Sequence, residues 1–197
     1  MSEVAAPTRR PPLPRRLRLM IVLAVVLTGL VVFAVVKALH YSSAPTTPSG
    51  IGEFTPKNTA PVAFSLQPLT ASGHGSKTTM SSLVGTPLVL NMWSSTCVVC
   101  KSESPAIESV AKTLGGRVRF IGVDSADERG AALAFLHKYG VTYPQLFDPT
   151  AVVATGYGIP GLPVTVFISA AGKVVGENVG ALSVTTLRHY LSVLFHE

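Results

Sequence analysis

An uninterrupted apolar segment near the N-terminus restricts what this chain can fold into more than any other feature. Residues 19–36 read LMIVLAVVLTGLVVFAVV and carry no charge, and only Thr28 adds a hydroxyl group. A helix that crosses the hydrocarbon core of a bilayer needs about 20 residues, so two further apolar residues beyond Lys37 complete a span. The sequence therefore predicts a transmembrane signal anchor over residues 19–39.

The positive charge of the chain is concentrated before this segment. The formal net charge is +6, and residues 1–18 contribute five arginines against one acid, whereas residues 38–197 hold ten basic and nine acidic residues. Basic residues flank transmembrane helices on the cytoplasmic side, so we expect residues 1–18 to be a cytoplasmic basic tail. The nearly neutral remainder would then lie outside the cytoplasmic membrane, and it offers no basic surface for nucleic acid.

A cleaved signal peptide is the alternative for the same segment. The apolar region of a signal peptide usually has about 7–15 residues, which is shorter than this one. No convincing pair of small residues marks a cleavage point, because Ser42-Ser43-Ala44 is followed by Pro45. Both interpretations place the rest of the chain on the far side of the membrane.

Residues 40–60 are rich in proline, serine, threonine and glycine. Such a stretch lacks the apolar content that would offset the entropy of ordering it, so we predict a flexible linker. The residues that remain, 61–197, are then one folded domain of ordinary size.

Short apolar runs alternate with helical periodicity throughout this domain. PLVLNMW at 87–93 is a continuous apolar run of strand length, as in a buried central strand. Two later runs joined by a glycine turn at 170–172 must pair antiparallel. The pattern predicts an α/β fold with a central mixed β-sheet flanked by helices. Strands are expected at 62–66, 77–79, 87–93, 117–124, 164–169 and 173–179, and helices at 97–114, 127–139, 149–155 and after Ser183.

Residue spacing also predicts the buried sides of these helices. In the helix at 127–139, Leu133, Leu136 and Tyr139 share one side, which we expect to be buried. Ser183 is a typical N-cap residue, and the segment that follows it has leucines at helical spacing.

The chain contains two cysteines, Cys97 and Cys100, and both lie at the expected start of the helix that follows the buried strand. A thiolate at a helix N-terminus faces free backbone N–H groups and the positive end of the helix dipole, which lowers the pKa of Cys97. Cys100, one turn later, is close enough to attack a mixed disulfide on Cys97. The pattern predicts a redox pair that alternates between dithiol and disulfide.

Three other uses of the cysteines are weaker. A structural disulfide between residues three apart closes so small a loop that it constrains the unfolded chain little. A zinc site needs four ligands, and the chain has no second cysteine pair and no paired histidines, so no metal is expected. A copper chaperone needs a distant histidine, but His137 and His189 fall within amphipathic helices, where a surface position is expected.

The segment NMWSSTCVVCKSESP at 91–105 resembles the active-site segment of thioredoxin-fold proteins of the TlpA/ResA/CcmG type, within the AhpC/TSA–redoxin superfamily. GLPVTVFI at 161–168, followed by GKVV, resembles the strand and hairpin of that family that begin with a cis-proline. The resemblance covers about residues 60–195 and implies a thioredoxin-like fold.

Carried over by position, the resemblance assigns roles near the cysteines. Cys97 would attack a disulfide, and the bond before Pro163 would be cis, leaving the backbone of Leu162 free to pair with an extended substrate. Trp93 and Thr96 would also bind substrate. Thr96 stands where the family usually has tryptophan, and Val98-Val99 replaces a dipeptide that more commonly contains proline, so the direction of electron flow is left open.

The resemblance also implies a role for Glu103, three residues after the resolving thiol, Cys100. A partly buried carboxyl there could relay a proton during exchange, whereas an exposed glutamate would only favour the start of the helix. Asn91 stands where thioredoxins proper have a buried aspartate, which assigns any proton relay to Glu103. Pro105 would kink the helix or start a second one.

The leading function is a membrane-anchored extracytoplasmic thiol–disulfide oxidoreductase that reduces disulfides of exported proteins. The family implies substrates such as the haem-attachment cysteines of apocytochrome c, a membrane thiol carrier as reductant, and no cofactor. The alternatives are a thiol oxidant, a peroxiredoxin-like peroxidase, and a non-enzymatic module that binds thiols or metal.

Overall fold

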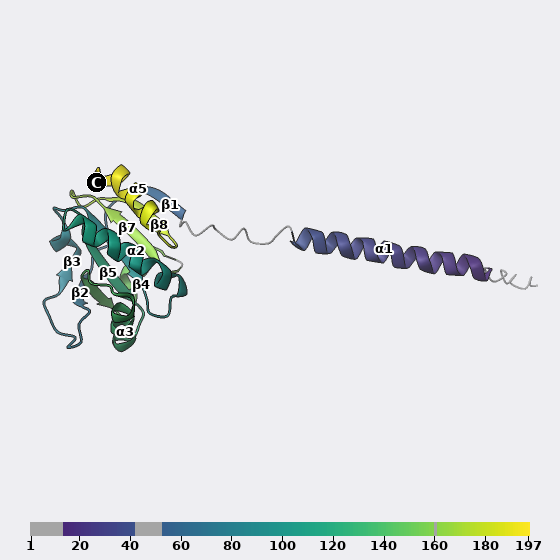
Figure 1. Cartoon of the computed structure of the whole chain (residues 1–197), viewed down its shortest axis with the longest axis horizontal. Coiled ribbons are helices and arrows are strands. Elements are labelled where there is room, and N and C mark those ends of the chain that lie inside the picture. Colours follow the sequence, from purple (N-terminus) through teal and green to yellow (C-terminus); the bar gives the residue numbers. More distant parts are fainter. Residues whose placement is uncertain (1–13, 42–52, 160) are drawn as a thin grey trace, which may run out of the picture. The chain divides into compact units, whose positions relative to one another are not determined.

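The computed structural model describes residues 14–41, 53–159 and 161–197 (Figure 1). Most of the predicted basic tail and residues 42–52 of the predicted linker lie outside the described residues. Helix α1, Arg15–Tyr41, belongs to an N-terminal unit separate from the rest of the chain. Within the described ranges, no helix is both long enough and apolar enough to cross a membrane, so the anchor predicted for residues 19–39 is not confirmed.

The described strands of the second unit form one eight-stranded sheet in the order β1-β8-β7-β4-β5-β6-β2-β3. Strands β4, β5 and β6 are parallel at its centre, and the other strands pair antiparallel, which confirms the predicted mixed sheet. Strand β2 begins at Ser65 rather than at Val62, where the sequence predicts it. The strands are β1 (Glu53–Thr59), β2 (Ser65–Pro68), β3 (Thr78–Thr79), β4 (Leu88–Trp93), β5 (Arg119–Ser125), β6 (Gln145–Asp148), β7 (Val164–Ile168) and β8 (Val174–Val179).

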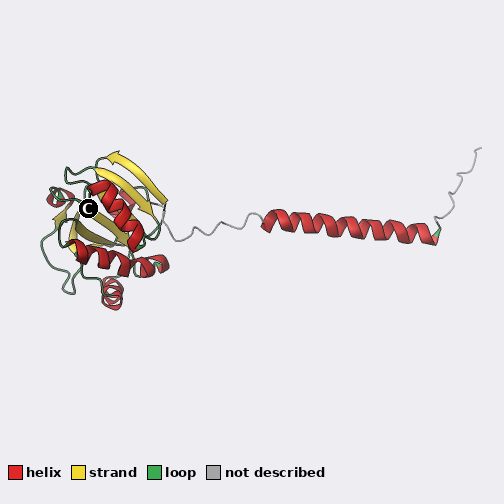
Figure 2. Cartoon of the chain, turned by 45° about the horizontal axis from the view of Figure 1, so that its top comes forward, coloured by secondary structure: helices red, strands yellow, loops and turns green. Residues whose placement is uncertain are grey.

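Helices cover both faces of this sheet. Helices α2 and α5 contact each other and pack on the face that carries Val89 and Phe167, whereas η1 and α4 contribute to the core on the opposite face. In Figure 2, two helices (red) cross in front of the strands (yellow). The helices are η1 (Met80–Leu83), α2 (Val98–Leu114), α3 (Arg129–Tyr139), α4 (Val152–Gly156) and α5 (Val184–Phe195).

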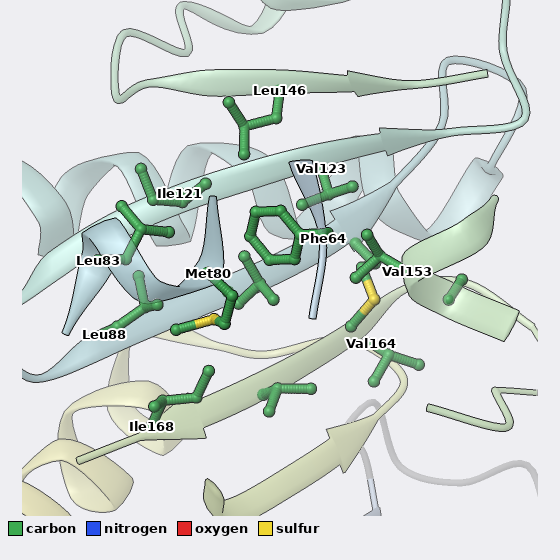
Figure 3. Packing of buried hydrophobic residues seen from close by; sticks show 14 of the residues in the cluster. Phe64, Met80, Leu83, Leu88, Ile121, Val123, Leu146, Val153, Val164 and Ile168 are labelled. Atoms are coloured by element: carbon green, nitrogen blue, oxygen red, sulfur yellow. The ribbon is translucent and has the colours of Figure 1, made fainter. Parts of the chain in front are cut away.

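Strand β4 is buried on both faces and therefore positions the site that follows it. Leu88, Leu90 and Met92 belong to the core cluster shown in Figure 3, together with aromatic and aliphatic residues from the segments that cover that face. Since successive side chains of a strand point to opposite faces, the alternate residues Asn91 and Trp93 point toward the face covered by α2. These two residues therefore lie beneath the start of α2.

Part of the predicted linker belongs to the sheet. Residues 53–59 form the edge strand β1, antiparallel to β8, so the prediction of a flexible linker is wrong for these residues. The ring of Phe54 stacks on Tyr190 with ring centroids 4.4 Å apart, and this packing offsets the cost of ordering the strand. Pro56 is compatible with an edge strand, where an N–H group is not needed for pairing on the open side.

The buried side of α3 differs from the prediction. Ala132 and Phe135 are its buried residues, and Phe135 stacks on the indole of Trp93 with centroids 4.5 Å apart. The buried side is turned toward Trp93 by this aromatic contact. The residues of this helix that the sequence predicts to be buried are only partly buried, and they pack against the cluster that contains Trp93 and Phe135: Leu133, Leu136 and Tyr139.

Candidate active site

The two cysteines lie at the junction of β4 and α2. Cys97 is the N-cap residue of α2, and its Sγ accepts a hydrogen bond from the backbone N–H of Cys100 at 3.1 Å. The two sulfurs form a disulfide, with Cα atoms 5.3 Å apart. After reduction, a Cys97 thiolate at this position would face the unpaired N–H groups of the first helical turn, which stabilise negative charge.

The two sulfurs differ in their access to solvent. Cys97 is partly exposed, whereas Cys100 is completely buried. The neighbouring valines, Val98 and Val99, are 76% and 44% exposed and form an apolar surface beside Cys97. An incoming disulfide can therefore reach Cys97 first, which is the asymmetry expected of an attacking thiol and a resolving thiol.

The carboxyl group of Glu103 is buried in α2 one turn after Cys100. Its residue is 1% exposed, Oε1 accepts a hydrogen bond from Asn91 Nδ2 at 3.0 Å, and Oε2 accepts one from the backbone N–H of Leu182 at 3.1 Å. Burial raises the pKa of Glu103 to about 7, although both hydrogen bonds act to lower it. The exposed alternative is therefore wrong, and this carboxyl changes its protonation near neutral pH.

Asn91 connects Glu103 to the sheet. Its Nδ2 also donates to Thr165 Oγ1 at 3.1 Å, and the two residues are paired across β4 and β7. An asparagine at this position gives the Glu103 carboxyl a hydrogen-bond donor, where an aspartate would add a second negative charge. A cavity of about 330 Å³ beside Glu103 provides a route toward solvent; it is lined by Ser102, Glu103, Ala106, Ala181, Leu182, Ser183 and Val184.

The loop before β7 lies against the redox pair. The Leu162–Pro163 peptide bond is cis, as the resemblance implies. Pro163 is buried, whereas Leu162 is partly exposed and packs against the cluster that contains Cys100. Thr96, directly before Cys97, is exposed. Leu162 and Thr96 are thus accessible to a substrate at the disulfide, and their binding roles stay predictions.

Trp93 has a different position from the one expected of a substrate-binding residue. It is 2% exposed, its indole N–H donates to Gln145 Oε1 at 2.8 Å, and it belongs to the same buried cluster as Cys100. A side chain enclosed in this way does not contact a substrate, so this prediction is corrected. Trp93 is turned inward because it points to the side of β4 that α2 and α3 cover.

The sequence interpretation missed a second polar group at this edge of the sheet. The carboxylate of Asp127 accepts hydrogen bonds from the backbone N–H and the hydroxyl of Ser95, in the loop that leads to Cys97. Asp124, near the end of β5, is completely buried. The available signal was a pair of aspartates, one at the end of an apolar strand and one just after it, since parallel strands β4 and β5 end at the same edge.

The described residues contain no group of three or more His, Cys, Asp or Glu side chains arranged to hold a metal ion. His137 and His189, which the sequence placed on helix surfaces, are both exposed, on α3 and α5.

Together, the mixed sheet, the helix-start disulfide and the cis-proline loop define a thioredoxin-like domain of the class that exchanges thiols and disulfides. The chain belongs to the AhpC/TSA family, whose model matches residues 56–176.

Two kinds of curated relative agree with this class. The thiol-disulfide oxidoreductase ResA of Bacillus subtilis is 28% identical over 122 residues, which are 61% of this chain and 68% of ResA. The thiol:disulfide interchange protein DsbE of Xylella fastidiosa is 34% identical over 110 residues, which are 55% of each chain. The matched region thus spans about two thirds of ResA and about half of DsbE.

Solved structures show the same fold. A secreted disulfide oxidoreductase of Mycobacterium tuberculosis, described as homologous to Escherichia coli DsbE, has 29% identity and a TM-score of 0.59, and the match covers 66% of this chain and 96% of that one. DsbF of the same organism has 31% identity and a TM-score of 0.60, covering 66% and 94%. The site and these relatives identify the chain as a thiol–disulfide oxidoreductase.

Proposed function

We propose that this chain is a membrane-anchored, extracytoplasmic protein-disulfide reductase in which Cys97 attacks and Cys100 resolves. The observation that carries the proposal is the asymmetry of the redox pair. The partly exposed cysteine, Cys97, caps a helix, whereas the buried Cys100 lies one turn before a carboxyl whose pKa is near 7. The relatives named for thiol–disulfide exchange support the chemistry.

The reaction begins with the reduced protein. The Cys97 thiolate attacks one sulfur of a substrate disulfide, forms a mixed disulfide and releases the other substrate sulfur as a thiolate, which takes up a proton. The Cys100 thiolate then attacks Cys97 Sγ, forms the Cys97–Cys100 disulfide and releases the second substrate thiolate. Two electrons pass to the substrate, and an external dithiol must return two electrons to this protein before the next cycle.

Glu103 accepts the proton that Cys100 loses before it attacks. A buried thiol ionises with difficulty because its charge is poorly solvated, so a nearby base assists the resolving step. With a pKa of about 7, the Glu103 carboxyl is partly ionised at neutral pH and can both take and return a proton. The cavity beside Glu103 lets that proton exchange with solvent.

The setting of the reaction is part of the proposal. Residues 19–39 would anchor the chain, with residues 1–18 in the cytoplasm and the catalytic domain outside, where exported proteins acquire disulfides. Oxidised exported proteins are then the substrates, with the haem-attachment cysteines of apocytochrome c as the particular case. A membrane thiol carrier supplies the electrons.

Replacing the resolving thiol tests the proposal. In Cys100→Ser, the mixed disulfide on Cys97 has no resolving partner, so the variant should accumulate covalent complexes with its substrates. These complexes are measured on non-reducing gels, and the trapped proteins are identified by mass spectrometry. Cys97→Ser is the matched control and should trap nothing. A module that only binds thiols or metal would give no complexes with either variant, and this result would overturn the proposal.

The reduction potential decides between a reductase and the thiol oxidant that the sequence left open. A value near that of thioredoxin, about −270 mV, is expected of a reductase, whereas a strong oxidant such as DsbA lies near about −120 mV. Equilibration with glutathione buffers, followed by the fluorescence of the single tryptophan, Trp93, measures this potential. The close packing of Trp93 with Cys100 makes its fluorescence sensitive to the redox state.

A further inference from the structure

The loop that carries Cys97 is tied to the next strand by one carboxylate. Asp127 Oδ1 accepts a hydrogen bond from Ser95 Oγ at 2.9 Å, and Oδ2 accepts one from the Ser95 backbone N–H at 2.5 Å. Oδ1 also accepts one from the backbone N–H of Glu128 at 2.8 Å. Ser95 lies two residues before Cys97, so these bonds connect the approach to the reactive sulfur with the loop between β5 and α3.

A second carboxyl lies behind the first. Asp124 pairs with Trp93 of β4 and with Phe147 of β6, which places it at the carboxyl ends of the parallel strands. It is 0% exposed, and neither of its carboxyl oxygens accepts a hydrogen bond from a donor among the described residues. A buried carboxylate without a donor is disfavoured, so burial favours the neutral acid of Asp124 over its ionised form.

Nearby charges and hydrogen bonds change the pKa values of Asp124 and Asp127. Burial is the largest cause of a pKa for Asp124 that is raised to about 8. The negative charge of Asp127, a hydrogen bond to Asp127 and the negative charge of Asp148 on β6 raise this pKa further. The positive charge of Arg129 on α3 opposes this shift, but the Arg129 Nη1 donates to backbone carbonyl groups and its guanidinium lies over the Phe147 ring. The pKa of Asp127 is lowered by its hydrogen bonds with Ser95, Glu128 and Asp124, although burial opposes them.

We propose that Asp124 and Asp127 share one proton, with Asp124 donating it to Asp127, and that this carboxyl pair positions the loop that carries Cys97. Asp124 is thus a positioning residue for thiol–disulfide exchange, acting through Asp127 and Ser95. The inference rests on the proposed use of Cys97 as the attacking thiol, but the carboxyl pair can be tested without that reaction.

The shared proton gives the site an upper pH limit. When Asp124 ionises, its buried carboxylate faces the partly exposed carboxylate of Asp127, and their repulsion moves Asp127 away from Ser95. The loop then holds Cys97 less firmly at the N-cap position, where the helix stabilises its thiolate. Above about pH 8, this loss opposes the gain in rate that a more ionised thiol would otherwise bring.

Carbon-13 NMR of the oxidised full chain tests the shared proton directly, because the disulfide removes both thiols from the titration. The sequence has three aspartates, Asp124, Asp127 and Asp148, so selective labelling gives three carboxyl signals. We expect the Asp124 signal to titrate near pH 8 and the Ser95 amide proton to shift in the same pH range. An Asp124 signal that titrates below about pH 5, in the ordinary range of an aspartate, would overturn the proposal.

Variants separate the carboxyl pair from general effects of charge. Asp124→Asn keeps a donor toward Asp127 at every pH, so the Ser95 amide should no longer shift near pH 8. Glu128→Gln removes a charge next to Asp127 from an exposed side chain that makes no capping hydrogen bond, and it should leave that shift in place. Asp127→Asn should lower the pH at which Asp124 titrates, and no change there would contradict the pairing.

The pH profile of the reaction tests the positioning role. The rate constants with which Asp124→Asn and the unchanged protein reduce a model disulfide are compared at several pH values. The ratio of the variant's rate constant to that of the unchanged protein should be close to one at pH 6.5. It should rise to about ten at pH 9.5, which corresponds to the loss of one hydrogen bond to a charged group. A ratio that stays constant with pH would contradict the positioning role, whereas absence of exchange by both proteins would contradict the proposed function instead.

Discussion

The chemistry of this chain depends on how single side chains are buried around one disulfide. Glu103 is the clearest case, because its two oxygens accept hydrogen bonds from Asn91 and from the backbone of Leu182, and burial still raises its pKa to about 7. The folded-state pKa lies above the ordinary value of 4.5, so Glu103 contributes most to stability below pH 4.5. That contribution is lost as the pH rises through about 7.

Replacing Glu103 by glutamine should remove this pH dependence. Between pH 4.5 and 7, the free energy of unfolding of the unchanged protein should fall by about 3 kcal/mol relative to Glu103→Gln, since one pKa unit corresponds to about 1.4 kcal/mol. Glu103→Gln should also resolve its mixed disulfide at least about tenfold more slowly at pH 7, because Cys100 would lose its proposed base.

Urea unfolding at several pH values and stopped-flow fluorescence of Trp93 measure these two effects. Glu128→Gln is the control for the loss of a negative charge, because that side chain is exposed. If Glu103→Gln keeps the pH dependence of the unchanged protein, then the carboxyl does not titrate where its burial implies, and the proposed proton transfer fails with it.

At the scale of elements, the edge strand β1 extends the sheet beyond the hairpin of β7 and β8. It pairs with β8, and the absence of a side chain at Gly176 leaves room for the Phe54 ring. A Cβ atom at Gly176 would lie 2.5 Å from Phe54 Cζ, closer than such atoms can approach. The packing of β1 therefore depends on a glycine in the neighbouring strand.

Gly176→Ala should displace Phe54 and lower the free energy of unfolding by about 1–3 kcal/mol, the usual cost of overpacking. Chemical denaturation measures the change. The reactivity of Cys97 should stay the same, because strands β8 and β7 lie between β1 and β4, the strand that leads to Cys97. Gly130→Ala is the matched control: nothing lies within 4 Å of its added Cβ, so α3 should gain up to about 1 kcal/mol. Equal effects of both changes would contradict this account of β1.

At the scale of the whole molecule, the charge distribution separates a basic N-terminal region from a nearly neutral catalytic domain. Five of the sixteen basic residues lie in residues 1–18, and the segment that follows is apolar and without charge up to Lys37. This arrangement motivates the proposed anchor, and a domain close to neutrality would leave recognition of the proposed exported substrates to the apolar surface beside Cys97.

The proposed anchor predicts that the full chain resists extraction from membranes by alkaline carbonate. The double variant Val25→Asp with Val32→Asp should be released into the supernatant, because each charge costs about 2.5–3.5 kcal/mol within a bilayer. Val25→Leu with Val32→Leu is the matched control and should stay in the membrane fraction. Extraction of the unchanged chain by carbonate would contradict the anchor.

Local chemistry explains why much of the fold was predictable. The continuous apolar run of β4, the helix that begins beside Cys97 and the Ser183 cap of α5 depend on residues close together in the chain. Strand β1 was missed because Phe54 is a single aromatic residue in a polar stretch, and its packing partners lie more than a hundred residues away.

The sequence by itself determined the redox pair, its position at a helix start and the mixed α/β architecture, because these follow from local spacing and periodicity. Only the tertiary structure decided how the pair is surrounded. The bond from Leu182 to Glu103 joins residues 79 apart, and that from Ser95 to Asp127 joins residues 32 apart. The pKa values of Glu103 and Asp124 depend on which distant elements bury them, and strand register and helix packing determine that burial.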